Sequence, residues 1–251
     1  MSSDAIRCIA PIWPAPPGIK ALTTLRTAGV SQAPYESLNL AAHVDDDEVA
    51  VRENRRRLMS GLQLPGEPVW LRQVHGCRIV DAADAVSGCE ADGARTARPD
   101  VVCAVLTADC LPVFLCNRSG TEVAVLHAGW RGLAAGVIES GLAALESPPE
   151  QLVAGFGPAI GPRRFEIGAE VRERLLESDP HSSTAFEASA NAGRWMADLY
   201  RLAELRLCRA GITMVADPAQ YSCTYEQSDR FFSYRRSGLC GRMASLIWID
   251  A

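Results

Sequence analysis

Three short apolar segments rich in β-branched residues follow one another in the centre of the chain, and they constrain its fold more than any other feature. They span residues 101–106, 112–116 and 123–126, and the polar sequences TADC and NRSGT separate them. Short apolar runs bounded by turn residues are typical of strands that are buried on both faces. We therefore expect three adjacent buried strands at the centre of the fold.

The rest of the chain predicts a mixed sheet with helices outside it. Further strands are expected over residues 20–26, 69–73, 77–82, 152–156, 212–216 and 244–249, and helices over 46–62, 129–145, 168–177 and 197–210. Three carboxylates, Asp45 to Asp47, suit the positive N-terminal end of the first helix. Because helices lie between clusters of strands, we expect an α+β or mixed α/β fold in one domain over residues 1–251, with 1–18 as an extended N-terminal segment.

Composition excludes several classes of function. The net charge of the 251 residues is −5, so the basic surface typical of nucleic-acid binding is missing. Lys20 is the only lysine, which excludes a GK[ST] phosphate loop. Nine cysteines, an odd number without a CxxC pair, favour the reducing cytoplasm. Neither a signal peptide nor an apolar run of about 18 residues is found, so no membrane partner is expected.

Three motifs each place a residue that can bind a metal at the end of a predicted strand. QVHG carries His75, TADC carries Cys110 and HAGWRG carries His127. Two imidazoles and one thiolate form a three-ligand set suited to Zn²⁺, with a fourth position left for water or substrate. From the residues alone, hydrogen-bonded core histidines and a small buried cysteine remain the alternative.

Together these motifs resemble the YfiH family, also called the laccase-domain or multicopper polyphenol oxidoreductase family. Its members include the peptidoglycan editing factor and the purine-metabolising FAMIN protein. The resemblance covers about residues 21–248, and it rests on SLNL with HV, ENR, QVHG, TADC, HAGWRG, GPAIGP and CTY followed by FFSYRR and GR, in that order. One departure is that Ala41 and Asp45 stand where the family usually has glycines, which bears on substrate contacts near His43.

The resemblance implies a fold, a metal site and an activity. The fold would be an α-β-β-α layered core related to bacterial deamidating toxins. The metal would be zinc, held by His75, Cys110 and His127. The activity would be phosphorolysis of adenosine, inosine, guanosine and methylthioadenosine to the base and a sugar 1-phosphate, with deamination of adenosine.

Histidine content argues against the copper oxidase that the older family name suggests. A trinuclear copper cluster and a blue-copper centre together need about ten histidines and one cysteine, by copper's preference for imidazole. The chain has only four histidines. A Cys/His₂ site would still bind Cu²⁺ in vitro, because copper stands highest in the affinity series, so oxidation by a copper-loaded sample would be incidental.

Several further residues are candidates for substrate binding and catalysis. Arg131, at the start of the helix after HAGW, is a candidate phosphate ligand, or else it pairs with a surface carboxylate. Asp109 could shuttle a proton, or it could cap the turn and orient the ligand next to it. Asn39 lies in SLNL and His43 follows it, and both could line the substrate site. For His43 the alternative is a place in a surface loop. Without a metal, Cys110 could act as nucleophile with His127 as base.

Other motifs are assigned to structure. Arg235 and Arg236 of FFSYRR could bind an anion, but we favour an edge strand anchored by its aromatic residues with the arginines facing water. We expect GPAIGP to form a turn, and His181 to be solvated.

The main prediction is a cytoplasmic, zinc-dependent enzyme that acts on purine nucleosides and phosphate. Two alternatives are a hydrolase that edits a peptidoglycan precursor and a protein whose zinc is structural and which binds a partner. Three well-placed ligands favour an open catalytic site over a closed structural one. The sequence leaves the oligomeric state open.

Overall fold

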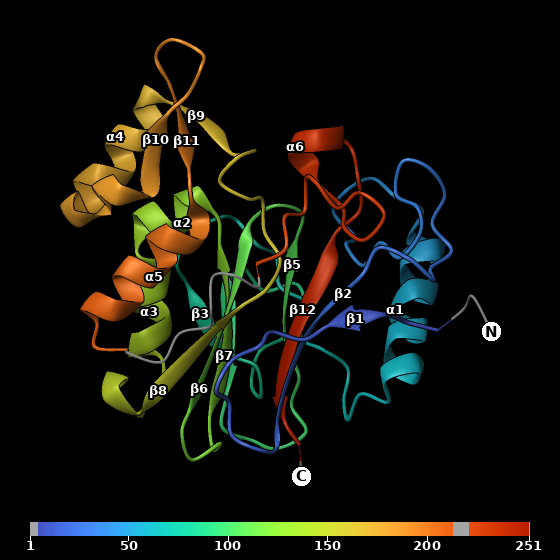
Figure 1. Ribbon diagram of the computed structural model, residues 1–251. Helices are drawn as coiled ribbons and strands as arrows, with labels where there is room; N and C mark the ends of the chain where they lie inside the picture. Colours follow the sequence, from blue (N-terminus) through green and yellow to red (C-terminus); the bar gives the residue numbers. More distant parts are fainter. Residues whose placement is uncertain (1–4, 213–220, 251) are drawn as a thin grey trace.

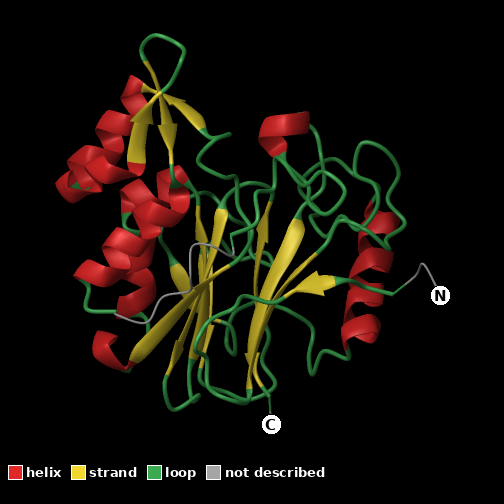
Figure 2. Ribbon diagram, in the orientation of Figure 1, coloured by secondary structure: helices red, strands yellow, loops and turns green. Residues whose placement is uncertain are grey.

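The computed structural model describes residues 5–212 and 221–250, and it places two β-sheets face to face in the middle of the fold (Figures 1 and 2). One sheet has the strand order β3-β4-β7-β6-β8, formed by Ile79–Asp81, Gly93–Thr96, Val123–Ala128, Leu111–Asn117 and Leu152–Phe156. The other has the order β1-β2-β12-β5, formed by Cys8–Ile9, Ile19–Thr24, Met243–Ile249 and Cys103–Thr107.

Helices cover the outer face of each sheet. Three helices pack on the five-stranded sheet: α2 (Trp130–Ala135), α3 (Val137–Ala143) and α5 (Leu199–Arg209). Helix α4 (Ala169–Ser178) packs against α2, farther from this sheet. The four-stranded sheet is covered by α1 (Glu48–Leu62). A third apolar cluster fills the space between the sheets. The mixed fold and its α-β-β-α layers are therefore confirmed, whereas the relation to deamidating toxins and the single-domain boundaries stay predictions.

The chain also contains small elements that the sequence patterns did not predict. A three-stranded sheet with the order β10-β11-β9 lies beside α4 (Figure 1). Its strands are Phe186–Ala188, Arg194–Ala197 and Glu166–Gly168, and the other additions are the one-turn helix α6 (Tyr234–Ser237) and the 3₁₀ turns Pro149–Gln151 and Pro180–Ala185. Helix α6 corrects the expected edge strand at FFSYRR, where Phe231 and Phe232 are buried just before the helix.

The three central strands form where expected, but they do not all share one sheet. Strands β6 and β7 pair antiparallel, whereas β5 pairs with β12 in the other sheet. The chain passes from one sheet to the other through the TADC segment, and Asp109 takes φ 102° at this corner. The expected adjacency of all three strands in one sheet is thus wrong, and Cys110 lies between the end of β5 and the start of β6.

Two other expectations need correction. The helix expected over 129–145 is divided into α2 and α3 at Gly136, which has φ 87°. Residues 69–73 form two isolated bridges instead of a strand, Val69 with Cys103 and Arg72 with Glu90. The other predicted helices are confirmed, whereas the strand expected over 212–216 lies outside the described residues after Ile212. Among the described residues, no helix is long and apolar enough to cross a membrane.

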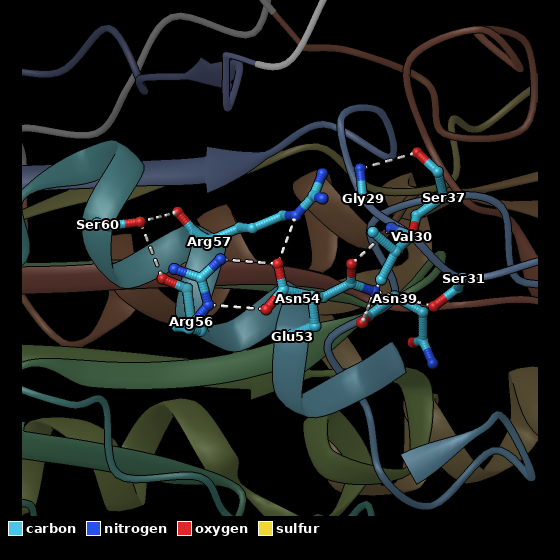
Figure 3. A network of polar contacts seen from close by, with 10 residues as sticks. All are labelled: Gly29, Val30, Ser31, Ser37, Asn39, Glu53, Asn54, Arg56, Arg57 and Ser60. Atoms are coloured by element: carbon cyan, nitrogen blue, oxygen red, sulfur yellow. Dashed lines mark hydrogen bonds and ion pairs between the residues drawn. The ribbon is translucent and has the colours of Figure 1, made fainter. Parts of the chain in front are cut away.

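Asn54 of the ENR motif anchors the long segment before α1. Its side-chain oxygen accepts from Val30 N–H at 2.8 Å, and its amide nitrogen donates to Asn39 O at 2.8 Å and Ser31 Oγ at 2.9 Å (Figure 3). Asn54 is completely buried. These bonds hold the segment that carries His43 against the first helix.

Candidate metal centre and its cavity

Three donor side chains from separate parts of the sequence meet at one end of the paired sheets. His75 follows the bridges of residues 69–73, Cys110 lies in the TADC corner and His127 lies near the end of β7. Their donor atoms all lie within 4.8 Å of one another. The structure thus brings together the three residues named from the sequence, and their roles as ligands stay a prediction.

Asp92 holds two of these side chains in place. Its Oδ1 lies 2.9 Å from His127 Nδ1 and accepts from the His75 backbone N–H at 2.9 Å, while its Oδ2 accepts from Gly76 N–H at 2.7 Å. The carboxylate is completely buried. Because Nδ1 is engaged by Asp92, Nε2 of His127 is left to face the other donors, an arrangement typical of metal-binding histidines.

The local charges favour a thiolate at Cys110. Burial alone would raise the pKa of this thiol, but the charge and hydrogen bonding of His127, with a further hydrogen bond from His75, hold the pKa below its usual range. Burial would lower the pKa of His127, whereas the Cys110 thiolate and Asp92 raise it above its usual range. Since metals bind the thiolate form of cysteine, the site is prepared for a cation.

Glycines of HAGWRG allow this close packing. A Cβ at Gly129 would lie 2.7 Å from Cys110 Sγ, which is too close for any side chain. A Cβ at Gly132 would lie 3.1 Å from Gly76 O and 3.2 Å from His127 O. Helix α2 can therefore start directly beside the donors only because these positions have no side chain.

A cavity of about 540 Å³ opens onto the three donors. This volume lies in the range of small-molecule sites. Its lining includes the buried Leu106 and Thr107 and three arginines, Arg131, Arg235 and Arg242. Asp109 is the only carboxylate among the lining residues, so the cavity of this acidic protein is itself cationic.

Sequence comparison assigns the chain to a family. A family model described as multi-copper polyphenol oxidoreductase laccase matches residues 20–250. The chain belongs to this family. It is 52% identical to "Purine nucleoside phosphorylase PA4543" of Pseudomonas aeruginosa, covering 96% of this chain and 98% of that protein. It is 47% identical to "Purine nucleoside phosphorylase YfiH" of Escherichia coli, covering 97% of this chain and 99% of that protein.

Solved structures agree with this family assignment. Protein NMB0706 of Neisseria meningitidis superposes with a TM-score of 0.91 at 46% identity, covering 97% of this chain and 99% of that one. YlmD of Geobacillus stearothermophilus gives a TM-score of 0.85 at 30% identity, covering 99% of this chain and all of that one. The resemblance inferred from the motifs is confirmed over nearly the whole chain.

The donor geometry bears on the copper chemistry in the family description. Among residues 5–212 and 221–250, His75, Cys110 and His127 form the one group of three or more metal-capable side chains. One group of three donors suits one ion. It does not suit the several copper ions of a multicopper oxidase.

The departure from the family glycines has a local explanation at one position. Asp45 takes φ 62°, the left-handed conformation that glycine adopts most readily and that aspartate tolerates better than most residues. The backbone after His43 therefore keeps the conformation for which the family glycine is suited. His43 lines the cavity, where burial and then the charge of Arg242 lower its pKa.

The other predicted site residues fall into two groups. Arg131 lines the cavity with its guanidinium 4.4 Å from the Trp130 ring, and within the described part of the chain no ion pair includes it. Asn39 does not line the cavity. It is completely buried, and its side-chain oxygen accepts from the backbone N–H of Arg242 at 3.0 Å. Asn39 therefore holds the backbone of Arg242, which does line the cavity.

Asp109 lines the cavity, but protein groups contact both of its carboxylate oxygens. Oδ1 accepts from Thr224 Oγ1 at 2.6 Å and Oδ2 accepts from Arg235 N–H at 2.7 Å. These bonds tie the TADC corner to the CTY and FFSYRR segments. Both roles considered for this residue stay predictions, and each oxygen keeps a further lone pair that could accept a proton.

The two arginines of FFSYRR differ from each other. Arg235 lines the cavity and donates to Glu166 O at 2.7 Å. Arg236 donates to Thr224 O at 2.7 Å and to Phe231 O at 2.8 Å, so it closes a loop instead of facing water as we favoured.

Sequence reasoning missed Asp92, Gln73 and Arg242. The Gln73 side chain forms two hydrogen bonds with the backbone of Leu106: it donates to the carbonyl at 2.9 Å and accepts from the N–H at 2.7 Å. Gln73 lies in the QVHG motif and Arg242 in the final GR, so these motifs marked both positions without giving a role. Asp92 had only a weak signal, an acidic residue between Ala91 and Gly93 ahead of a buried strand.

Proposed function

We propose that this chain is a zinc-dependent purine nucleoside phosphorylase that also deaminates adenosine. The observation that carries the proposal is the meeting of His75, Cys110 and His127 on a cavity whose other charged groups are mainly arginines. The names of the curated relatives support phosphorolysis of purine nucleosides. The proposed substrates are adenosine, inosine, guanosine and methylthioadenosine, and the proposed location is the cytoplasm.

The donor set fits zinc better than other common metals. One thiolate and two imidazoles match tetrahedral zinc sites with three protein ligands, which leave one position open to substrate. Asp92 fixes His127 in the tautomer that can bind a metal through Nε2. Zinc bound by these side chains would supply a Lewis acid that polarises an oxygen of the substrate or of water.

The arginines supply what phosphorolysis needs from the protein. A phosphate oxygen forms a bond to C1′ of the sugar while the C1′–N9 bond breaks, its electron pair passes to the purine and the purine takes up a proton. The transition state resembles an oxocarbenium ion, so the phosphate must be held close to C1′. Arg131, at the cavity wall, can bind phosphate with paired hydrogen bonds, and Arg235 and Arg242 add positive charge.

Deamination of adenosine replaces the C6 amino group with oxygen from water and needs a group that moves a proton. Asp109 is our candidate, acting through whichever carboxylate oxygen faces the substrate. An asparagine at this position can still accept the hydrogen bond from Arg235 N–H, but it has no carboxylate to take up a proton. Asp109→Asn is therefore expected to reduce inosine formation from adenosine more than it reduces phosphorolysis of inosine.

The deciding experiment is to incubate metal-analysed protein with adenosine, with and without phosphate, and to follow products by mass spectrometry. Adenine and ribose 1-phosphate that depend on phosphate, or inosine formed without it, would support the proposal. Arg131→Gln should raise KM for phosphate by about tenfold, because it loses a charge-assisted hydrogen bond. A folded, zinc-loaded sample that forms no product would contradict the proposal.

Cys110→Ser separates a catalytic metal from a structural one. Loss of turnover with an unchanged far-ultraviolet circular dichroism spectrum supports catalysis at an open site. Loss of the fold, or a fourth protein ligand detected by X-ray absorption, would support a structural zinc and a binding role.

A further inference from the structure

One lining residue of the cavity has a buried hydroxyl without a hydrogen-bond partner in the protein. Within residues 5–212 and 221–250, five buried side-chain polar atoms lack a partner: Trp70 Nε1, Thr107 Oγ1, Arg172 Nε, Arg206 Nε and Trp248 Nε1. Thr107 alone among these residues lines the cavity of the donor cluster. It belongs to the TADC motif, and the proposed mechanism gives it no role.

The strand alternation places this side chain on the same side as the donors. Cys103 and Val105 of β5 pack in the cluster between the sheets, and Thr107 has the same parity along the strand. On β7 the same cluster contains Val123 and Val125, and His127 continues that row. Thr107 and His127 therefore extend from facing sheets into the same space, where the TADC corner also brings Cys110.

Packing alone does not account for a hydroxyl at this position. Thr107 is only 1% exposed, and the other residues of β5 are Cys103, Ala104, Val105 and Leu106, all apolar. Valine has the same branched shape and would suit the strand equally well. A buried hydroxyl without a partner destabilises the folded protein relative to such an apolar isostere. The hydroxyl itself has almost no accessible surface in the ligand-free protein, so its side chain must rotate toward the cavity for a polar ligand group to become its partner.

We propose that Thr107 is a substrate-binding residue whose hydroxyl forms a hydrogen bond with the 2′- or 3′-hydroxyl of the nucleoside, the two ribose hydroxyls that all the proposed substrates share. This inference rests on the proposed function. The Thr107 hydroxyl is uncharged, whereas Arg131, Arg235 and Arg242 in the same lining suit the anionic phosphate, so an uncharged polar group of the substrate suits Thr107 best. A threonine hydroxyl donates and accepts, as a sugar hydroxyl does, so the two are complementary.

The first test uses substrates that lack single hydroxyl groups. Phosphorolysis of adenosine, 2′-deoxyadenosine and 3′-deoxyadenosine is measured with the wild type, Thr107→Val and Thr107→Ser, each with its zinc content determined. Thr107→Val should lower kcat/KM for adenosine by roughly five- to twentyfold, the effect of one lost hydrogen bond. It should change kcat/KM much less for the analogue that lacks the bonded hydroxyl, and Thr107→Ser should restore most of the rate on adenosine.

A second readout needs no substrate. Since the hydroxyl has no partner in the free protein, Thr107→Val should raise the Tm of the ligand-free protein by roughly 2–4 °C. A fall in Tm would mean that the hydroxyl has a structural partner, and it would overturn the assignment.

The outcomes distinguish this inference from the proposed function. If the wild type is active and Thr107→Val loses the same factor on all three nucleosides, the ribose contact is wrong while the phosphorylase proposal stands. If the zinc-loaded wild type cleaves none of them, the proposed function is wrong and the ribose contact falls with it.

Discussion

Asp92 is the residue through which the donor cluster is held together. Replacing it with asparagine keeps the size of the side chain but removes the negative charge that faces His127 Nδ1 and three backbone N–H groups of the QVHG loop. Loss of such an orienting carboxylate typically weakens metal binding 10- to 100-fold. We expect Asp92→Asn to show a loss of about this size when zinc affinity is measured by competition with a chromophoric chelator.

A matched control is Asp84→Asn, because Asp84 is an exposed carboxylate that pairs with Arg98 on the surface. Its zinc affinity should equal that of the wild type. If Asp92→Asn retains the full affinity, then the hydrogen bond to His127 does not orient the ligand.

At this scale the sequence predicted the donors but not the residues that orient them. His75, Cys110 and His127 are residue types that bind metals and lie at the ends of predicted strands, so the motifs named them and the family resemblance agreed. Asp92 and Arg242 contact the site through the tertiary fold, and neither has a local spacing that reveals its partner. The substrate-binding role named for Asn39 stays a prediction: the residue lies in a distinctive motif, but its side chain forms hydrogen bonds with Ala41, Asp46 and Arg242.

At the scale of elements, the break between α2 and α3 depends on a glycine at position 136. Its φ of 87° is accessible to glycine at little cost, whereas alanine is destabilised there. Gly136→Ala should lower the free energy of unfolding by about 1 kcal/mol, measured by urea denaturation. An increase in stability would mean that residues 129–145 can form the continuous helix that the sequence pattern predicts.

Helix α1 stabilises the segment that brings His43 to the cavity, and Asn54 provides the connection. Asn54→Ala leaves Val30 N–H and the carbonyl of Asn39 without their partner in a buried setting. The expected loss is roughly 2–3 kcal/mol of unfolding free energy. Arg52→Ala, an exposed position on the same helix, should change stability by less than about 0.5 kcal/mol. Equal effects from both variants would contradict the anchoring role.

Element type was more predictable than element partnership. Apolar runs of four to six residues identified β5, β6 and β7, but a run buried on both faces looks the same in either sheet. The partner of β5 is β12, more than a hundred residues away in the sequence. The strands of the small sheet β10-β11-β9 have three or four residues each, too few for a periodic pattern to be distinguished from a loop.

At the scale of the whole molecule, the donors join parts of the fold that are otherwise connected mainly by apolar packing. Cys110 lies where the chain leaves one sheet for the other, His127 lies on the five-stranded sheet, and His75 lies on a loop that Gln73 fastens to β5. A metal bound to all three therefore links the two sheets. Because such a metal binds the folded chain and not the unfolded one, binding should add directly to the free energy of unfolding.

Removal of zinc by a chelator should consequently lower the Tm of the wild type. Free zinc at 100 to 1,000 times its Kd contributes roughly 3–4 kcal/mol, which corresponds to roughly 10 °C in a chain of this length. Cys110→Ser should show little response to the chelator, whereas Cys208→Ser, at an exposed cysteine on α5, should respond like the wild type. Differential scanning fluorimetry with and without chelator measures all three proteins. A wild type whose Tm is unaffected by chelation, after zinc loss is verified by elemental analysis, would show that the ion does not link the sheets.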